Sequence, residues 1–391
     1  MTDRVYLDHN ATSPLRPEAR AAMAAVLAET GNASSIHAEG RAARARVEAA
    51  RTAVAGLVGA EPAAVTFTSG ATEAIALALS PELELSGRSV RCDVLLISGV
   101  EHPAVRAGGR FPAERIEIIP VDREGIVDLI ALDAMLTRHR NGGRRALVSV
   151  LAANNETGVI EPLREIGARV HAAEGVFHTD AVQIAGRYPF GLETSGADLI
   201  SLSSHKLGGP QGAGALIARD ADTRLPPLLR GGGQERGARA GTENVAAIAG
   251  FGAVATSAGV MLAEEVGRLA GLRDRLEDGL RDIAPQAVIL SAGALRIPNT
   301  TCFAVPGIAA ETAVIAFDLE GVALSAGAAC SSGKVGPSTA LAAMKIEPEL
   351  ARGAVRASLG WNSTRADIVR FLEIFARLYA ALTERSRTKA A

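Results

Sequence analysis

Seven short apolar runs, with helical segments between them, constrain the fold of this chain more than any other feature of its sequence. Near-continuous apolarity is typical of strands that are buried on both faces of a parallel sheet. The runs cover residues 65–69, 94–98, 116–121, 146–151, 176–179, 198–203 and 213–218. Residues 41–59 carry apolar side chains at helical spacing, and Gly59 is well placed to end that helix. The alternation predicts an α/β fold with a mainly parallel seven-stranded sheet flanked by helices.

The sequence pattern changes after about residue 255, where a long amphipathic helix is expected. Its apolar stripe consists of Leu262, Val266, Leu269, Leu276, Leu280 and Ile283. We therefore predict a large domain over residues 15–257 and a smaller α+β domain built from residues 1–14 and 258–391. The chain ends with another amphipathic helix, which Ser363 or Thr364 opens.

Charge and cysteine usage exclude several classes of function. The 41 basic and 43 acidic residues nearly cancel, and no basic block is interleaved with aromatic residues, so no direct nucleic-acid binding is expected. No apolar run was found to reach the length of a membrane span and no signal peptide precedes the domain, so we expect a cytoplasmic protein without membrane contact. Cys92, Cys302 and Cys330 suit neither a disulfide framework nor a zinc site, so no metal is expected.

Lys206 lies where an apolar strand runs into a glycine-rich loop, within residues 197–215. A lysine held there beside apolar walls can lose its proton and form a Schiff base, although a solvated surface lysine is the commoner case. The strand before it ends in Asp180, at the edge of the sheet where ligands gather. A carboxylate there could keep the pyridinium nitrogen of a cofactor protonated, and helix capping is the alternative.

Two further segments fit a cofactor site. Residues 65–74 form a strand, a turn and a helix start whose backbone N–H groups and Thr72 hydroxyl make a phosphate cradle, although such a threonine is usually only an N-cap. His102 ends another strand, and Pro103 helps to fix it. Its flat ring could stack on a planar cofactor, whereas a lone histidine is more often structural.

Nine motifs in this chain resemble those of the cysteine desulfurases and occur in that family's order. They occupy residues 6–12, 31–37, 69–73, 101–103, 154–158, 178–183, 203–206, 241–244 and 355–360. The resemblance covers nearly the whole chain. It implies the type I fold of pyridoxal-phosphate-dependent, class V aminotransferase-like enzymes, with a large cofactor domain, a smaller domain and a homodimeric assembly.

The resemblance also implies a role for each candidate residue that would contact the cofactor, pyridoxal 5'-phosphate. Lys206 would be the Schiff-base lysine, Asp180 the partner of the pyridine nitrogen and Gln183 the partner of the ring hydroxyl. His102 would stack on the ring, and either His102 or His205 would move protons. The groups expected at the phosphate are Ala71, Thr72, Ser203 and His205, with Thr242 reaching across from the other subunit.

The substrate would be held by Arg356, because a guanidinium presents two parallel donors to the two oxygens of a carboxylate. Asn155 would assist it. Without the surrounding motif, a surface ion pair would be the simpler interpretation of Arg356.

Cys330 distinguishes this family from enzymes with the same cofactor. It lies among glycines and small polar residues, within a loop of about residues 325–338, and this composition suits an exposed loop more than a core. Cys92 and Cys302 are interpreted as buried small hydrophobic residues. The motif resembles the long-loop desulfurases, in which the thiolate attacks the sulfur of L-cysteine. Alanine and a Cys330 persulfide would result, and the sulfur would pass to an iron–sulfur scaffold or another acceptor protein.

Other functions remain open at this point. An aminotransferase or β-lyase would use the same lysine, aspartate and arginine, and selenocysteine differs from cysteine by one atom. A non-catalytic sulfur-assembly partner could keep the fold alone. The sequence departs from the commonest family pattern at Ala33 and at residues 361–362. We hypothesise that Trp361 alters the rim of the pocket or the acceptor surface.

Overall fold

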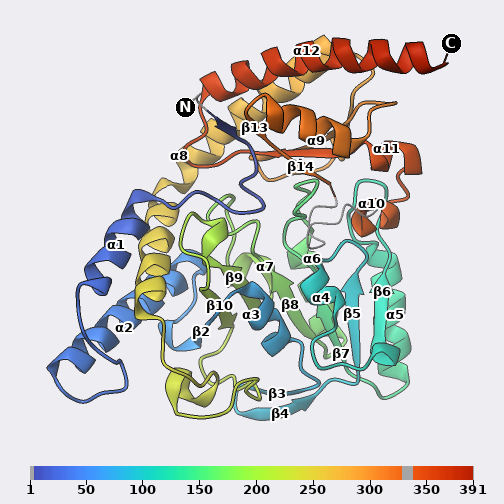
Figure 1. Cartoon of the computed structure of the whole chain (residues 1–391). Coiled ribbons are helices and arrows are strands. Elements are labelled where there is room, and N and C mark those ends of the chain that lie inside the picture. The colour runs from blue at the N-terminus through green and yellow to red at the C-terminus, as the bar shows by residue number, and fades with distance from the viewer. Residues whose placement is uncertain (1–3, 328–337, 391) are drawn as a thin grey trace.

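A seven-stranded sheet forms the centre of the protein, in the order β2-β10-β9-β8-β7-β5-β6 (Figure 1). The computed structural model describes residues 4–327 and 338–390. The strands are β2 (Val65–Thr68), β5 (Val94–Ser98), β6 (Ile116–Ile119), β7 (Ala146–Ser149), β8 (Val176–Asp180), β9 (Leu199–Ser203) and β10 (Gly214–Ala218). The pairings from β6 to β9 are parallel, and only β10 pairs antiparallel, with β2 and β9. All seven predicted strands and the mainly parallel character of the sheet are confirmed.

The central strands are mostly apolar because both faces of the sheet are covered. On β5, Leu95 and Ile97 join the core under α3 (Ala71–Ala78), whereas Val94 and Leu96 join the core on the opposite face. Neighbouring residues of a strand point to opposite faces, so each core takes every second residue. The opposite face carries α2 (Ala38–Val58), α5 (Leu129–Asn141), α6 (Leu163–Ala172), α7 (Leu192–Ser195) and the start of α8 (Val245–Ile283).

The predicted helix ends are confirmed where the sequence marked them. Helix α2 stops at Gly59, whose φ of 68° is the left-handed conformation that glycine adopts readily. Helix α12 (Arg365–Ala390) begins with a reciprocal pair, in which the Thr364 N–H donates to Asp367 Oδ2 at 2.7 Å and the Asp367 N–H donates to Thr364 Oγ1 at 3.3 Å.

A second, smaller sheet lies at one end of the molecule and carries its own core. Its order is β11 (Val288–Ile289), β12 (Thr300–Ala304), β15 (Val355–Ser358) and β14 (Ser325–Ala326), and all three pairings are antiparallel. Helices α9 (Ala310–Leu319) and α12 cover it, with four aromatic rings in contact: Phe303, Phe317, Phe371 and Phe375. The N-terminal β1 (Val5–Tyr6) pairs with β13 (Val322–Ala323) beside this core.

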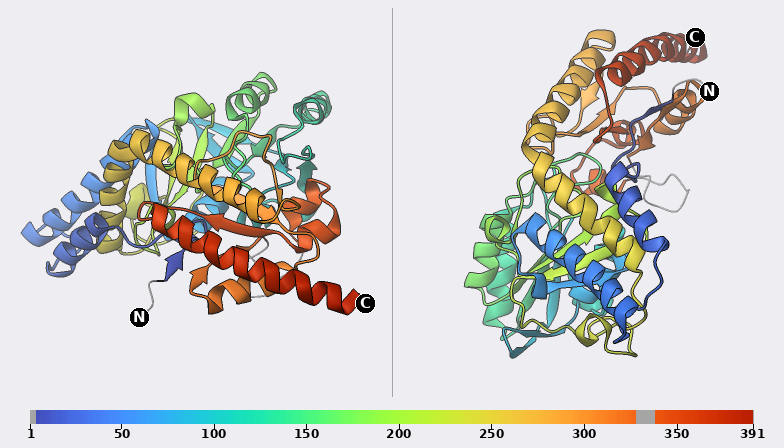
Figure 2. Two further views of the ribbon diagram at one scale, coloured as in Figure 1. Left: turned by 90° about the horizontal axis from the view of Figure 1, so that it is seen from above. Right: turned by 90° about the vertical axis from the view of Figure 1, so that its left-hand side faces the viewer.

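Helix α8 runs through both parts of the molecule, as Figure 2 shows. Phe251 and Val254 pack in the core of the large sheet, while Leu269 and Leu276 pack in the core of the small sheet. The domain boundary predicted near residue 257 therefore falls inside a continuous helix. In addition, the segment after residue 258 does not pack only on the small core, because α10 (Thr339–Ala343) contributes Ala340 and Leu341 to the large one.

The prediction that no apolar run reaches the length of a membrane span is wrong for helix α8. Among the described residues, α8 is the one helix that is long and apolar enough to cross a membrane. In this structure 44% of its most apolar window is buried inside the protein. The core helix of a globular protein meets the same criterion. In this structure α8 packs against α1 (Pro17–Leu27) and α2.

The remaining elements are short. The antiparallel hairpin β3 (Glu82–Leu85) and β4 (Arg88–Arg91) closes one end of the molecule, as seen at the bottom of Figure 1. The others are α4 (Pro103–Arg106), α11 (Pro348–Arg352) and the 3-10 turns η1 (Pro62–Ala64), η2 (Ala113–Arg115), η3 (Ser204–Lys206) and η4 (Gln234–Gly237).

Candidate active site

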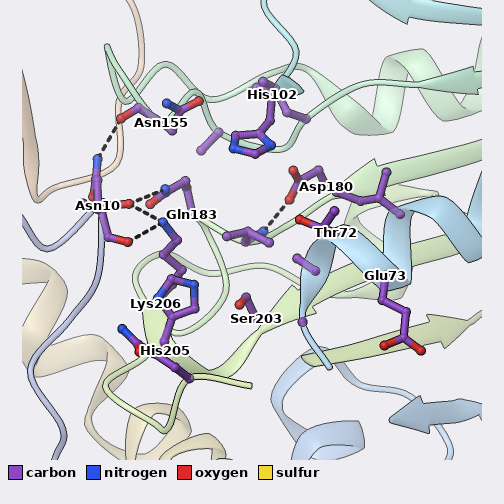
Figure 3. A pocket seen from close by; sticks show the side chains of 18 of the residues that line it. Asn10, Thr72, Glu73, His102, Asn155, Asp180, Gln183, Ser203, His205 and Lys206 are labelled. Carbon is purple, nitrogen blue, oxygen red and sulfur yellow. Dashed lines mark hydrogen bonds between the residues drawn. The ribbon is translucent and has the colours of Figure 1, made fainter. Parts of the chain in front are cut away.

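A cavity of about 530 Å³ lies at the carboxyl ends of β8 and β9, next to the start of α3 (Figure 3). Parallel strands bring side chains from distant parts of the sequence to this edge of the sheet. Ten of the predicted site residues line it: Ala71, Thr72, His102, Asn155, Asp180, Gln183, Ser203, His205, Lys206 and Arg356. Cys330 lies outside the described residues.

Lys206 sits at the end of η3, the turn that follows β9 directly. Its Nζ donates to the backbone oxygens of Asn10 at 2.6 Å and Ala11 at 2.8 Å (Figure 3). Both acceptors are neutral carbonyl groups from the N-terminal segment. They hold the amine at the wall of the cavity.

Asp180 ends β8 and is buried, as expected of a residue at the end of a strand covered on both faces. Its Oδ1 accepts the Val182 N–H at 3.0 Å. Burial raises the pKa of the Asp180 carboxyl, and the nearby His102 and Lys206 act in the opposite direction. A cationic partner inside the cavity would therefore stabilise the ionised carboxylate.

His102 caps the N-terminus of α4, where its Nδ1 accepts the Ala104 N–H at 3.1 Å. Accepting this bond leaves the ring proton on Nε2 in the neutral form. Burial lowers the pKa of His102, with Asp180 opposing, so the neutral ring is favoured. Figure 3 shows this ring on one side of the cavity, with Lys206 and Ser203 on the other.

The start of α3 has the geometry of an anion site. Gly70 precedes the helix and gives no side-chain cap, so the first N–H groups remain available beside Thr72. Gly214 of β10 lies directly against this turn: a Cβ at residue 214 would be 2.5 Å from the Gly70 carbonyl carbon. The helix start is thus seated closely on the sheet. Glu73 points away from the cavity in Figure 3, and its carboxylate accepts the Ser69 N–H at 2.7 Å.

His205 contacts the N-terminal segment as well. Its Nδ1 lies 3.1 Å from Thr12 Oγ1. Burial, together with the charges of Lys206 and Arg187, lowers the pKa of His205 to about 4, so the ring is neutral near pH 7.

Thr242 does not line this cavity. It lines a neighbouring one of about 240 Å³, which shares Ser69 and Gly212 with the first. Thr242 is expected to act in the site of the other subunit. Its position within one chain does not test this role, which stays a prediction.

Arg356 on β15 is only 1% exposed. Its Nη2 donates to Asp8 Oδ1 at 2.7 Å and its Nη1 to the Asn155 backbone oxygen at 2.9 Å. The buried Nε has no hydrogen-bond partner among the described residues. Arg356 lines the cavity and each Nη carries a second N–H group, so its guanidinium can donate to a carboxylate there.

Two residues that the sequence reasoning assigned no role are central to the site. Asn10 accepts from Lys206 and Gln183 through its backbone oxygen, and Arg187 donates to the Asn10 and Gln183 side chains. Asn10 lies in one of the matched motifs, whereas no pattern in the sequence marks Arg187. The described part of the chain contains no cluster of three or more histidine, cysteine or carboxylate side chains that could hold a metal ion.

Trp361 lies behind the site and does not line the cavity. Its Nε1 donates to the Pro14 backbone oxygen at 3.0 Å, and the Arg16 guanidinium lies 5.6 Å from its ring centre. The geometry therefore gives no support to a role of Trp361 at the rim of this pocket.

Comparison with known proteins identifies the family of the whole chain. The family model for aminotransferase class-V matches residues 5–371. A cysteine desulfurase of Cereibacter sphaeroides is 43% identical over 380 residues, which is 95% of each chain, and a cysteine desulfurase IscS of Dictyoglomus turgidum is 38% identical over 98% of this chain and 96% of its own. The crystal structure of a NifS-like protein from Rickettsia africae superposes with a TM-score of 0.86 at 33% identity, covering 96% of this chain and 99% of the other. The chain belongs to the aminotransferase class-V family.

Proposed function

We propose that this chain is a cysteine desulfurase, which removes sulfur from L-cysteine and leaves L-alanine. One observation carries the proposal: Lys206, Asp180, His102 and the uncapped start of α3 meet in a single cavity. An amine, a carboxylate, a flat ring and an anion site are the set of groups that pyridoxal phosphate, the cofactor of this family, needs.

The residues of the cavity fit that cofactor. Burial raises the pKa of the Asp180 carboxyl, and a protonated pyridine nitrogen beside it would favour the ionised carboxylate. The neutral His102 ring would cover one face of the cofactor ring. Thr72 and the first N–H groups of α3 would hold the phosphate, with Ser203 and His205 beside them.

The chain's own groups prepare the removal of the substrate's Cα proton. Bound pyridoxal phosphate supplies an electron sink for the carbanion that forms at this carbon. The Lys206 amine takes the proton, and the carbonyl oxygens of Asn10 and Ala11 orient that amine. Arg356 would hold the substrate carboxylate through the N–H groups that Asp8 and Asn155 do not use, and Asn155 lies beside it.

Sulfur transfer is assigned to Cys330 by its sequence motif. The thiolate attacks the substrate's sulfur, so an S–S bond forms while the substrate's C–S bond breaks. The electron pair of the broken bond stays on the substrate carbon, which is protonated on the way to alanine. The persulfide on Cys330 then carries the sulfur.

Two neutral imidazoles can take up or return protons in these steps. Burial lowers the pKa of both His102 and His205, so both rings are neutral near pH 7. His102 then presents the N–H of Nε2 as a donor, because its Nδ1 already accepts the Ala104 N–H. His102 is nearer to Asp180, and His205 is linked to Thr12.

The further expectations belong to the same proposal. The chain works as a homodimer in the cytoplasm, Thr242 completes the partner's phosphate site, and the sulfur passes to an iron–sulfur scaffold or another acceptor protein. Cytoplasmic thiols are kept reduced, which suits a catalytic cysteine.

The test measures alanine and sulfide released from L-cysteine in the presence of a reductant. Lys206→Ala and Cys330→Ala should each abolish release, with a loss of at least about 10²-fold. Cys92→Ala is the matched control, because this buried thiol, whose pKa is raised to about 12, lies away from the cavity and should leave activity intact. Turnover that survives Cys330→Ala would instead identify a lyase or an aminotransferase.

A further inference from the structure

Arg187 is a buried guanidinium in the turn after β8, 8% exposed and four residues beyond Gln183. Its Nη1 donates to Asn10 Oδ1 at 2.9 Å and to Gln183 Oε1 at 2.5 Å. Its Nη2 donates to the backbone oxygens of Lys206 at 2.6 Å and His9 at 3.1 Å. All four acceptors are neutral oxygens.

This cation is buried without a hydrogen-bonded carboxylate among the described residues. Burial and the charges of Arg356 and Arg16 lower the pKa of Arg187 to about 10, and Glu265 acts in the opposite direction. Glu265 itself is bound by Arg16 through both oxygens at 2.8 Å. Burying a charge on neutral acceptors is costly, and an apolar side chain of similar size would avoid that cost. Packing alone therefore does not explain the residue.

The guanidinium determines which way the Gln183 amide faces. Arginine has only donors, so the Gln183 atom that faces it has to be the oxygen. On its other side the amide Nε2 donates to the Asn10 backbone oxygen at 3.1 Å, and a carbonyl requires a donor there. Two independent contacts thus fix the same orientation, in which Gln183 donates and cannot turn its oxygen inward.

The same guanidinium is connected to Lys206 by two sets of hydrogen bonds, one direct and one through Asn10. It holds the backbone oxygen of Lys206, and it holds the side chain of Asn10, whose backbone oxygen accepts the Lys206 amine at 2.6 Å. Asn10 is further fixed by Thr300 Oγ1, which lies 2.9 Å from its Nδ2. One side chain therefore ties together the three segments that carry Asn10, Gln183 and Lys206.

We propose that Arg187 is a positioning residue that fixes Gln183 as a hydrogen-bond donor to the ring oxygen of the cofactor and seats the backbone that carries Lys206. The inference rests on the proposed function, because it assumes pyridoxal phosphate in the cavity. A donor facing the ring oxygen stabilises its anionic form. Without Arg187 only the Asn10 carbonyl holds the amide, so the donor orientation is less firmly fixed and the ring oxygen binds its proton more tightly.

The measurement is the pH midpoint of the visible absorbance change of the bound cofactor, recorded without cysteine. Arg187→Gln removes the fixed charge and can donate or accept, so the midpoint should rise by about one pH unit. Arg187→Lys still presents only donors, so its midpoint should stay close to that of the wild-type protein. Arg296→Gln is the matched control: Arg296 is also buried, bonds Glu277 and contacts neither Gln183 nor Lys206, so the midpoint should not move.

A double-mutant comparison separates orientation from charge. The titratable or charged groups that line the cavity are Glu73, His102, Asp180, His205, Lys206 and Arg356, and none of them is substituted in these variants. In a Gln183→Leu background, Arg187→Gln should shift the midpoint by less than half as much, since no amide remains to be oriented. Equal shifts in both backgrounds would mean that Arg187 acts through its charge alone and would overturn the proposal, as would no shift in either.

Failure of this inference is distinguishable from failure of the proposed function. If the wild-type protein binds the cofactor but releases no alanine from cysteine, the function is wrong while the absorbance comparison still stands. If Arg187→Gln does not fold, Arg187→Lys set against Gln183→Leu gives the same decision: the former should keep the wild-type midpoint and the latter should raise it.

Discussion

Gly214→Ala tests whether the anion site depends on the close approach of β10 to the start of α3. The added Cβ would lie 2.5 Å from the carbonyl carbon of Gly70, 2.6 Å from its Cα and 2.8 Å from the Leu202 backbone oxygen. Ordinary contact begins at 3.4 Å, so the Gly70 turn has to move by about 0.9 Å. These neighbours are backbone atoms, which cannot rotate away as a flexible side chain does.

The displacement has two measurable effects. Overpacking of this kind costs about 1–3 kcal/mol of unfolding free energy. A shift of nearly 1 Å at Gly70 also moves Ala71 and Thr72, so we expect about 10- to 100-fold weaker binding of pyridoxal phosphate.

The assay titrates cofactor-free protein with pyridoxal phosphate and follows thermal unfolding of the same samples. Gly271→Ala is the control, because Gly271 lies in α8 with nothing within 4 Å of the added Cβ. It should stabilise the protein by about 0.5–1 kcal/mol and leave cofactor affinity unchanged. Wild-type affinity in a destabilised Gly214→Ala variant would refute the link between this contact and the phosphate site.

Three further predictions concern the dimer, pH and the residue behind the site. Co-expressed Lys206→Ala and Thr242→Ala subunits should form mixed dimers with one intact site if Thr242 acts across the interface, and an inactive mixture would place it in its own subunit's site. Burial raises the pKa of Glu161 to about 8, so the free energy of unfolding should fall by a few kcal/mol as pH rises from about 4.5 to 8. Glu161→Gln should remove that fall in denaturant titrations, and an equal difference from wild type at pH 5 and pH 8.5 would contradict this. Trp361→Ala should lower stability by about 1–2 kcal/mol through its lost contacts with Pro14 and Arg16 while leaving the KM for cysteine unchanged; an altered KM would restore its proposed role at the pocket.

The large sheet could be predicted from the sequence because its strands have to be apolar on both faces. Most of the strands satisfy this condition over consecutive residues, which is a local signal, whereas the edge strand β6 carries Glu117 and an exposed Ile118. Lys206, Asp180 and His102 were found for a related reason, since Asp180 ends such a strand and the other two lie in the short segments that follow β9 and β5.

The contacts of Asn10 and Arg187 could not be predicted in this way. They are 177 residues apart in sequence, and their hydrogen bond exists only because the N-terminal segment crosses the end of β8. The contact of Arg356 with Asp8 was missed for the same reason, because Asp8 lies 348 residues away.

The start of α8 was placed too late because its first part lacks an amphipathic stripe. Residues such as Ala247, Gly250, Gly252 and Ala255 are buried on several sides, so the segment between Asn244 and residue 255 shows no polar face. Amphipathic periodicity appears only where the helix reaches the small sheet and one side meets solvent.

The unbroken 39-residue helix α8 is about 58 Å long and contributes side chains to both cores. The small sheet carries Arg356. It cannot rotate away from Lys206 as a rigid body without breaking backbone hydrogen bonds in the middle of α8. Unfolding of either core would expose apolar side chains of the same helix to water. The two halves therefore gain and lose their structure together, and the spacing between the substrate's carboxylate site and the lysine is fixed when the chain folds.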